Sequence, residues 1–275
     1  MPLRRRLLTT LFAAGAASLL AAQPRAAEPG PEAMAAHRAA YRLTLDRSRD
    51  NSNIVRAEGA MLYEVVDACD GWATRQRFTL TLTDRDGQEV ETASDYSTYE
   101  SKDGRRLRFT LTQTSQGAVS QRVAGEAEVT AQGGIVHYTE PQGKDVPLPQ
   151  GTLLPMQHTI RALAAARAGT RILALPLFDG TDSDGAQDTT TVIAGWQGPR
   201  PNERFPALAQ LGSARMRIAF FDRDPGAGGG GANAPDYEVG LRYYANGVAD
   251  ELNMDFGEFS VHGRMQELML LPSGC

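Results

Sequence analysis

The chain has 275 residues, of which 41% are hydrophobic, enough for a sizeable core in one large domain or two small ones. Its formal net charge is −5, which becomes −9 without residues 1–27, because these contain four arginines and no acidic residue. This negative balance argues against nucleic acid or an anionic membrane surface as the main partner.

The N-terminal segment has the pattern of a secretory signal peptide. Three arginines at positions 4–6 precede a short apolar run, residues 7–22, that ends in small residues. The run is too short and too rich in alanine for a membrane span. The paired arginines also loosely resemble a twin-arginine export signal, so the export route stays open. We expect residues 1–27 to be removed, at an undefined cleavage site, and residues 28–275 to form one domain.

Strand-like alternation begins near Ala39. Tyr41, Leu43 and Leu45 alternate with polar residues, as on a half-buried strand. The pattern recurs at spacings of about ten residues as far as residue 139, with glycine-containing turns such as Asp86-Gly87 between the runs. This indicates an antiparallel meander.

Prolines interrupt the meander at residues 141–155, and one helix is predicted after them. Pro155 suits the first helical position, and Gly169 suits the residue just past the end. One face of this helix carries Met156, Ile160, Leu163 and Ala164. We expect the helix to pack inside the curve of a sheet.

Strand patterns resume after the helix. They cover residues 171–178, 189–196, 214–221, 237–244, 252–259 and 264–271. A glycine-rich stretch interrupts them without separating a second domain. The predicted fold is therefore mainly β: a single large curled antiparallel sheet, or open half-barrel, with a helix on its concave side.

No motif for catalysis, a cofactor or a metal stands out. No pair of histidines has metal-ligand spacing, and the cysteines lack a C-x-x-C partner. Residues 179–185 resemble a calcium loop, but Gly180 stands where the first carboxylate belongs, so a tight turn is favoured. His158, Trp72 and Trp196 are each candidates for a ligand site, with a core or sheet-edge role favoured. Acidic residues from distant strands that meet in the fold stay possible.

The only two cysteines are Cys69 and Cys275. In an oxidising compartment an isolated pair usually forms a bridge, and the alternative is two separate buried thiols. A terminal residue such as Cys275 is hard to bury without a tether, which favours the bridge. Its expected stabilisation is about 5 kcal/mol in the chain-entropy model.

Several segments, in order and spacing, resemble the EipB family of cell-envelope integrity proteins, which is catalogued as a domain of unknown function. They are Cys69-Asp70-Gly71-Trp72, Pro155-Met156-Gln157-His158-Thr159, Phe178-Asp179-Gly180, Asp236-Tyr237-Glu238-Val239, Asn246-Gly247-Val248 and Cys275. The resemblance covers residues 35–275. It implies a periplasmic protein of Gram-negative bacteria with a β-spiral fold, related in shape to the lipoprotein carriers LolA and LolB. It also implies a Cys69–Cys275 disulfide and supplies no catalytic residue.

These observations lead to a functional expectation. We expect a non-enzymatic periplasmic protein, not spanning the membrane, that maintains cell-envelope integrity by binding a protein or an envelope component. The alternative is a carrier of a lipid or lipoprotein acyl chain in the concave groove. An exported hydrolase is the weakest hypothesis, because no nucleophile–base motif is recognisable.

Overall fold

The computed structural model describes residues 34–223 and 234–272. Within them, fourteen strands form one sheet in the order β8-β7-β6-β5-β4-β3-β2-β1-β14-β13-β12-β11-β10-β9, and every neighbouring pair is antiparallel. No helix in these ranges is both long and apolar enough to cross a membrane. The predicted signal peptide, residues 1–27, lies outside the described residues and stays a prediction.

The strands form two arms that meet where β1 pairs with β14. The N-terminal arm comprises β1 (His37–Ser48), β2 (Ile54–Asp67), β3 (Gly71–Asp84), β4 (Glu89–Ser101), β5 (Arg106–Ser115), β6 (Ala118–Thr130), β7 (Gly133–Glu140) and β8 (Lys144–Leu148). The C-terminal arm comprises β9 (Ile172–Leu177), β10 (Gln187–Gln197), β11 (Ser213–Phe221), β12 (Tyr237–Tyr244), β13 (Ala249–Asp255) and β14 (Phe259–Leu270). The helix α1 (Pro155–Arg167) connects the arms, and a 3-10 helix, η2 (Pro206–Leu208), lies between β10 and β11.

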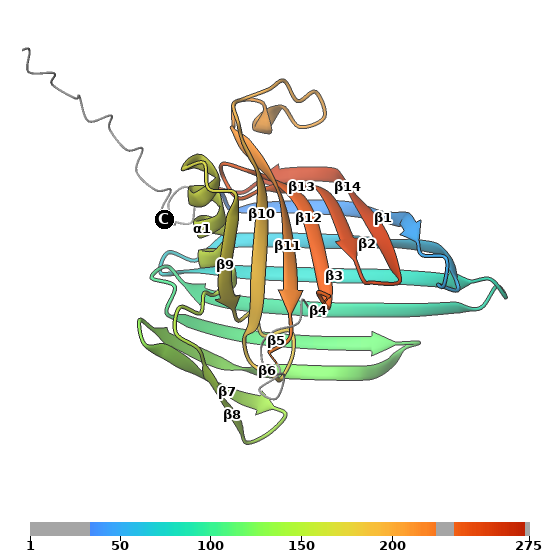
Figure 1. Ribbon diagram of the computed structural model, residues 1–275, viewed down its shortest axis with the longest axis horizontal. Helices are drawn as coiled ribbons and strands as arrows, with labels where there is room; N and C mark the ends of the chain where they lie inside the picture. Colours follow the sequence, from blue (N-terminus) through green and yellow to red (C-terminus); the bar gives the residue numbers. More distant parts are fainter. Residues whose placement is uncertain (1–33, 224–233, 273–275) are drawn as a thin grey trace, which may run out of the picture.

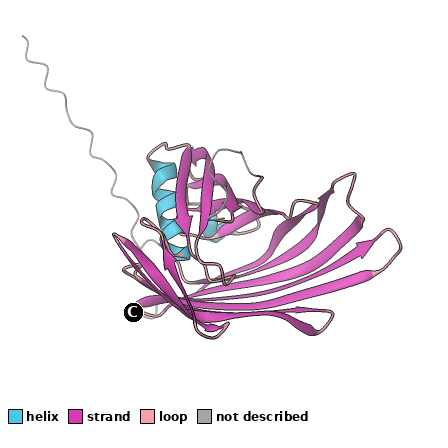
Figure 2. Cartoon of the chain, turned by 60° about the horizontal axis from the view of Figure 1, so that its bottom comes forward, coloured by secondary structure: helices cyan, strands magenta, loops and turns pink. Residues whose placement is uncertain are grey.

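The sheet curls over itself. In Figure 1 the strands β9 to β13 cross in front of the long strands of the N-terminal arm at a steep angle, and Figure 2 shows α1 at one end of the curl. The curl stays open, since β8 and β9 do not pair. Instead, the segment before α1 bonds to β9: Leu153 N–H donates to the Pro176 carbonyl (2.9 Å), and Phe178 N–H donates to the Leu153 carbonyl (3.0 Å). The predicted open, curled antiparallel sheet with one helix is therefore confirmed.

The alternation of apolar and polar residues predicted most of the strands and the face that each one buries. Tyr41 and Leu43 are buried on the concave face of β1, as their spacing predicts. Two predictions were wrong. The predicted strand 252–259 crosses the turn between β13, which ends at Asp255, and β14, which begins at Phe259. The strand β8 lies inside the proline-rich stretch that was expected to interrupt the sheet. Pro147 is tolerated there because β8 is an edge strand, which leaves one side of its backbone without ladder bonds.

Two hydrophobic clusters hold the curl. The larger contains Met156, Ile160 and Leu163 of α1 together with residues of β1 to β3 and β10 to β14. The smaller joins β5 to β8 with Phe178 and Ala186, which flank the turn between β9 and β10. The second cluster therefore fastens the outer strands of one arm to the far end of the other.

Candidate functional site

A cavity of about 490 Å³ lies between the two arms. It is lined by the concave faces of β3, β4 and β5 on one side and of β11, β12 and β13 on the other, with the first turn of α1 between them. Its volume falls within the range of about 300–1,000 Å³ that is usual for small-molecule sites. A second cavity of about 240 Å³ shares Tyr63, Gln76 and Tyr237 with the first and extends toward β1.

The wall formed by the N-terminal arm carries most of the uncharged polar side chains of the cavity, beside Phe78 and Leu111. Its hydroxyl and amide side chains are Thr74, Gln76, Thr92, Ser94, Thr98 and Gln113. They share one face because positions two apart on a strand point the same way. Among the described residues, no side-chain hydrogen bond pairs Gln76, Ser94 or Gln113 with another protein group, and none of their polar atoms is sealed from solvent. These groups are therefore available to a ligand or to water.

The wall formed by the C-terminal arm is apolar and aromatic. It consists chiefly of Ile218, Phe220, Tyr237, Val239, Leu241 and Phe256. A row of rings runs along it: the ring centroids lie 5.7 Å apart for Phe220 and Tyr237, 5.2 Å for Tyr237 and Phe256, and 5.1 Å for Phe256 and Phe259. Phe256 is 37% exposed, so the row reaches solvent.

Glu100, at the end of β4, binds the start of α1 inside the cavity. Leu154, the N-cap residue, offers no side-chain acceptor to the free N–H groups of the first turn. The Glu100 carboxylate replaces it, accepting from Met156 N–H (2.7 Å) and Gln157 N–H (3.0 Å). Burial raises the pKa of Glu100 to about 7, and the two N–H donors offset only part of that effect.

The other acidic residue of the cavity and its histidine also contact protein groups. Asp179 accepts from the backbone N–H (3.0 Å) and the hydroxyl (2.7 Å) of Thr181. His158 is 4% exposed, with Nε2 3.5 Å from the Thr191 hydroxyl, and burial lowers its pKa to about 4. No Lys or Arg lines this cavity in the described part of the chain. The cavity thus lacks a cation and presents mainly neutral groups.

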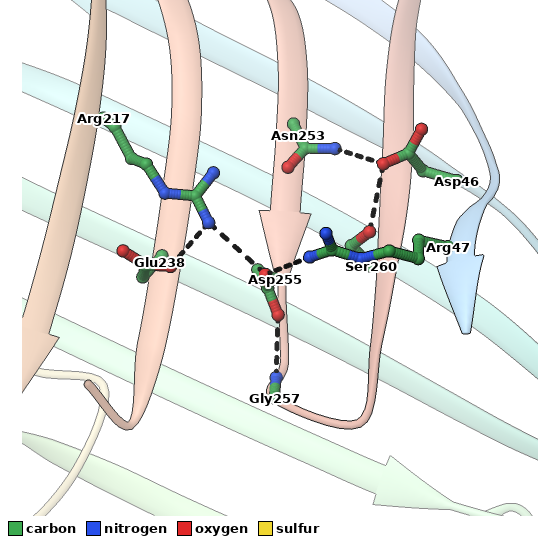
Figure 3. Close-up of polar contacts among 8 residues, drawn as sticks. All are labelled: Asp46, Arg47, Arg217, Glu238, Asn253, Asp255, Gly257 and Ser260. Atoms are coloured by element: carbon green, nitrogen blue, oxygen red, sulfur yellow. Dashed lines mark hydrogen bonds and ion pairs between the residues drawn. The ribbon is translucent and has the colours of Figure 1, made fainter. Parts of the chain in front are cut away.

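Charged side chains gather instead on the outer face of the C-terminal arm (Figure 3). Asp255 on β13 is 5% exposed and accepts from Arg47 Nη2 (3.1 Å) and Arg217 Nη2 (3.3 Å). Arg217 also pairs with Glu238 (2.5 Å). The remaining contacts in this view involve Asp46, Asn253, Gly257 and Ser260. Arg47 and Arg217 balance the charges of Asp255 and Glu238, and Asp46 accepts hydrogen bonds from Asn253 and Ser260. The network therefore links neighbouring strands and braces the arm.

The residues singled out by sequence have the following positions. His158 is buried on the inner face of α1, and Trp72 is buried in the larger cluster, with the Lys102 ammonium 3.6 Å from its ring centroid. Trp196 is half-buried beside Arg167. Residues 179–185 form the turn between β9 and β10, as predicted. Within the described ranges, no group of three or more His, Cys, Asp or Glu residues could hold a metal ion.

The structure describes only one residue of the predicted cysteine pair. Cys69 lies exposed in the turn between β2 and β3, and its N–H donates to Asp67 Oδ1 (3.0 Å). Cys275 lies outside the described residues, so the disulfide stays a prediction. The cavity itself was not predicted, because its lining comes from strands far apart in the chain. The Thr/Ser/Gln alternation along β3 and β4 was the one signal of its polar wall.

Comparison with known proteins finds a family model, a relative and a solved structure that are similar to this chain. The family model described as EipB-like matches residues 29–272. The chain belongs to the EipB-like family. It is 30% identical over 243 residues to the cell envelope integrity protein EipB of Brucella abortus, covering 86% of this chain and 85% of that protein. The crystal structure of a β-barrel-like protein of the domain of unknown function DUF1849, also from Brucella abortus, superimposes with a TM-score of 0.77 at 27% identity, covering 87% of this chain and 99% of the other.

Proposed function

We propose that this protein maintains the integrity of the cell envelope by binding an envelope component in the cavity between its two arms. The observation that carries the proposal is that cavity, with accessible polar groups that have no protein partner on one wall and aromatic rings on the other. Support for the role comes from the family, since a relative is named a cell envelope integrity protein. Export by residues 1–27 and residence of residues 28–275 in the periplasm, without enzymatic activity, are part of the same proposal.

The test replaces one side chain on each face of β4. Ser94 lines the cavity, so Ser94→Trp fills it. Ser97 faces the opposite side of the same strand, so Ser97→Trp adds the same bulk outside the cavity. In a strain lacking the native gene, we expect Ser97→Trp to restore resistance to detergents and cell-wall antibiotics, and Ser94→Trp to fail at equal amounts of folded protein. Restoration by both variants would contradict the proposal, as would unchanged sensitivity of the deletion strain.

A lipid or lipoprotein acyl chain is the second candidate occupant. The apolar wall of the C-terminal arm favours it. The opposite wall counts against it, because an acyl chain would remove water from hydroxyl and amide groups without giving them a new partner. Mass spectrometry of lipids extracted from the purified protein tests this candidate directly.

A further inference from the structure

We infer that the cavity between the arms is a binding site for a neutral oligosaccharide, held between the hydroxyl and amide groups of the N-terminal arm and the aromatic rings of the C-terminal arm. This inference rests on the proposed function, and it names the chemical class of the ligand. Three properties of the cavity lead to it: its charge, the difference between its two walls, and the row of rings that continues to its mouth.

The charge of the lining disfavours ionic ligands. In the described part of the chain no Lys or Arg faces the cavity, so a phosphate or carboxylate would find no cation there. The two acidic residues, Glu100 and Asp179, already accept hydrogen bonds from the protein. A cationic ligand would therefore compete with the first turn of α1 and with Thr181. A neutral ligand meets neither penalty.

The two walls require a ligand that is polar on one side and apolar on the other. Thr92, Ser94 and Gln76 supply hydroxyl and amide groups that donate and accept hydrogen bonds. Phe220 and Tyr237 supply aromatic side chains to the opposite wall. A pyranose ring has this character, since hydroxyl groups surround its edge while its C–H groups form apolar faces that pack on aromatic rings. An acyl chain packs on the aromatic wall but makes no hydrogen bonds with the hydroxyl and amide groups of the other wall.

A peptide fits less well, for a different reason. Extended peptides are recognised largely through main-chain hydrogen bonds to the free edge of a sheet. The cavity walls are faces of interior strands: β4 is paired on both sides by β3 and β5, and β12 by β11 and β13. Their backbone groups are used within the sheet, so recognition depends on side chains.

The row of rings supports a chain of sugars over a single sugar. Phe220, Tyr237, Phe256 and Phe259 follow one another at centroid distances of 5.1–5.7 Å. The row begins inside the cavity with Phe220 and reaches solvent at Phe256. In Figure 1 this region corresponds to the lower ends of β11 and β12, which lie over the N-terminal arm. An oligosaccharide is therefore able to extend out of the cavity along this row.

The test is calorimetric titration of the mature full-length protein with two neutral probes, the β-1,4-linked tetramers of glucose and of N-acetylglucosamine. We expect at least one to bind with an affinity that does not depend on salt. Phe220→Ala should weaken binding about tenfold, equivalent to ~1.4 kcal/mol. Phe221→Ala, the matched control, removes a ring from the next position of β11, which does not line the cavity, and should leave affinity unchanged.

Gln76→Leu separates the sugar from a lipid. It keeps the side-chain volume and removes the amide, so it should weaken binding of the tetramer about tenfold and leave a fluorescent fatty acid unbound. Failure of both tetramers to bind would overturn the inference, as would equal losses in Phe220→Ala and Phe221→Ala, or fatty-acid binding that tightens in Gln76→Leu. If the tetramers fail while Ser94→Trp still cannot restore the envelope, only the ligand class is wrong. If Ser94→Trp restores it, the proposed function fails as well.

Discussion

Glu100 connects β4 to the helix through one buried carboxylate. It supplies acceptors to two N–H groups that the N-cap residue Leu154 cannot satisfy. Burial raises its pKa from 4.5 to about 7, so the folded state holds this proton more tightly than the unfolded chain. The contribution of Glu100 to the free energy of unfolding is therefore complete below pH 4.5 and is lost as the pH rises toward 7.

We expect Glu100→Gln to remove this pH dependence. His158 acts in the opposite direction, because burial lowers its pKa from 6.5 to about 4, so stability is lost as the pH falls through that interval. In Glu100→Gln the His158 effect is no longer offset by Glu100, so the unfolding free energy should rise more steeply between pH 4.5 and 6.5 than in the wild type. The difference amounts to at most about 3 kcal/mol across the window of Glu100. Urea unfolding at a series of pH values measures it, and parallel curves for the two proteins would disprove it.

Residue-level roles of this kind were the hardest to predict from sequence. Pro155 and Gly169 identified the ends of α1 correctly, because helix ends depend on local backbone preferences. The role of Glu100 could not be predicted from the sequence. Its partners lie 56 and 57 positions further along the chain and meet it only after the sheet has curled. His158 is buried and also lines the cavity, so its position fits both the core-edge role and the ligand-site role that the sequence offered.

At the level of elements, the turn between β9 and β10 fastens one arm to the other. Phe178 packs edge-to-face on Phe109 of β5, with ring centroids 5.3 Å apart. Gly180 follows with φ +76°, and a Cβ placed there would lie 2.4 Å from the Phe109 side chain. This position requires glycine both for its backbone conformation and for its closeness to the ring.

Gly180→Ala should destabilise the protein more than Gly87→Ala. Gly87 has almost the same φ, +77°, but no atom lies within 4 Å of the position that its Cβ would take. Gly87→Ala therefore measures the backbone strain alone, about 1–2 kcal/mol, while Gly180→Ala adds about 1–3 kcal/mol for overpacking against Phe109. Denaturant unfolding of both variants gives the two values. Equal losses would show that Phe109 moves aside freely and that this joint is loose.

At the scale of the whole molecule, sequence predicted the architecture better than the binding surface. A period of two residues describes each strand and its buried face, and runs such as Leu107, Phe109 and Leu111 are buried as expected. Periodicity carries no information about how far a sheet curls. The cavity arises only because β11 to β13 lie over β3 to β5, and this depends on long-range packing at Phe178 and α1.

The proposed Cys69–Cys275 disulfide belongs to this scale, since it would link the two arms near the strand where they meet. Leu270, the last residue of β14, pairs with His37, which pairs in turn with Val65 of β2. Two strand spacings, roughly 10 Å, separate β14 from β2. Cys69 lies four positions beyond Val65, up to about 13 Å further along the chain, so Leu270 and Cys69 are roughly 17 Å apart. The five positions from Leu270 to Cys275 can span up to about 17 Å, and a disulfide adds about 5.5 Å between its Cα atoms, so the chain is long enough for the bridge.

We expect Cys69→Ser to lower the unfolding free energy by about 5 kcal/mol, because the bridge would close a loop of more than 200 residues in the unfolded chain. Cys275→Ser should cost the same amount, and the double variant no more than either single one, because all three remove one bond. Reductant should lower the melting temperature of the wild type and leave that of the variants unchanged. Proteolysis should then begin in β14, which pairs with β1 and would lose its covalent link to the turn after β2. Additive losses in the double variant, or a wild-type melting temperature that reductant does not change, would point to two independent thiols, the alternative that the sequence left open.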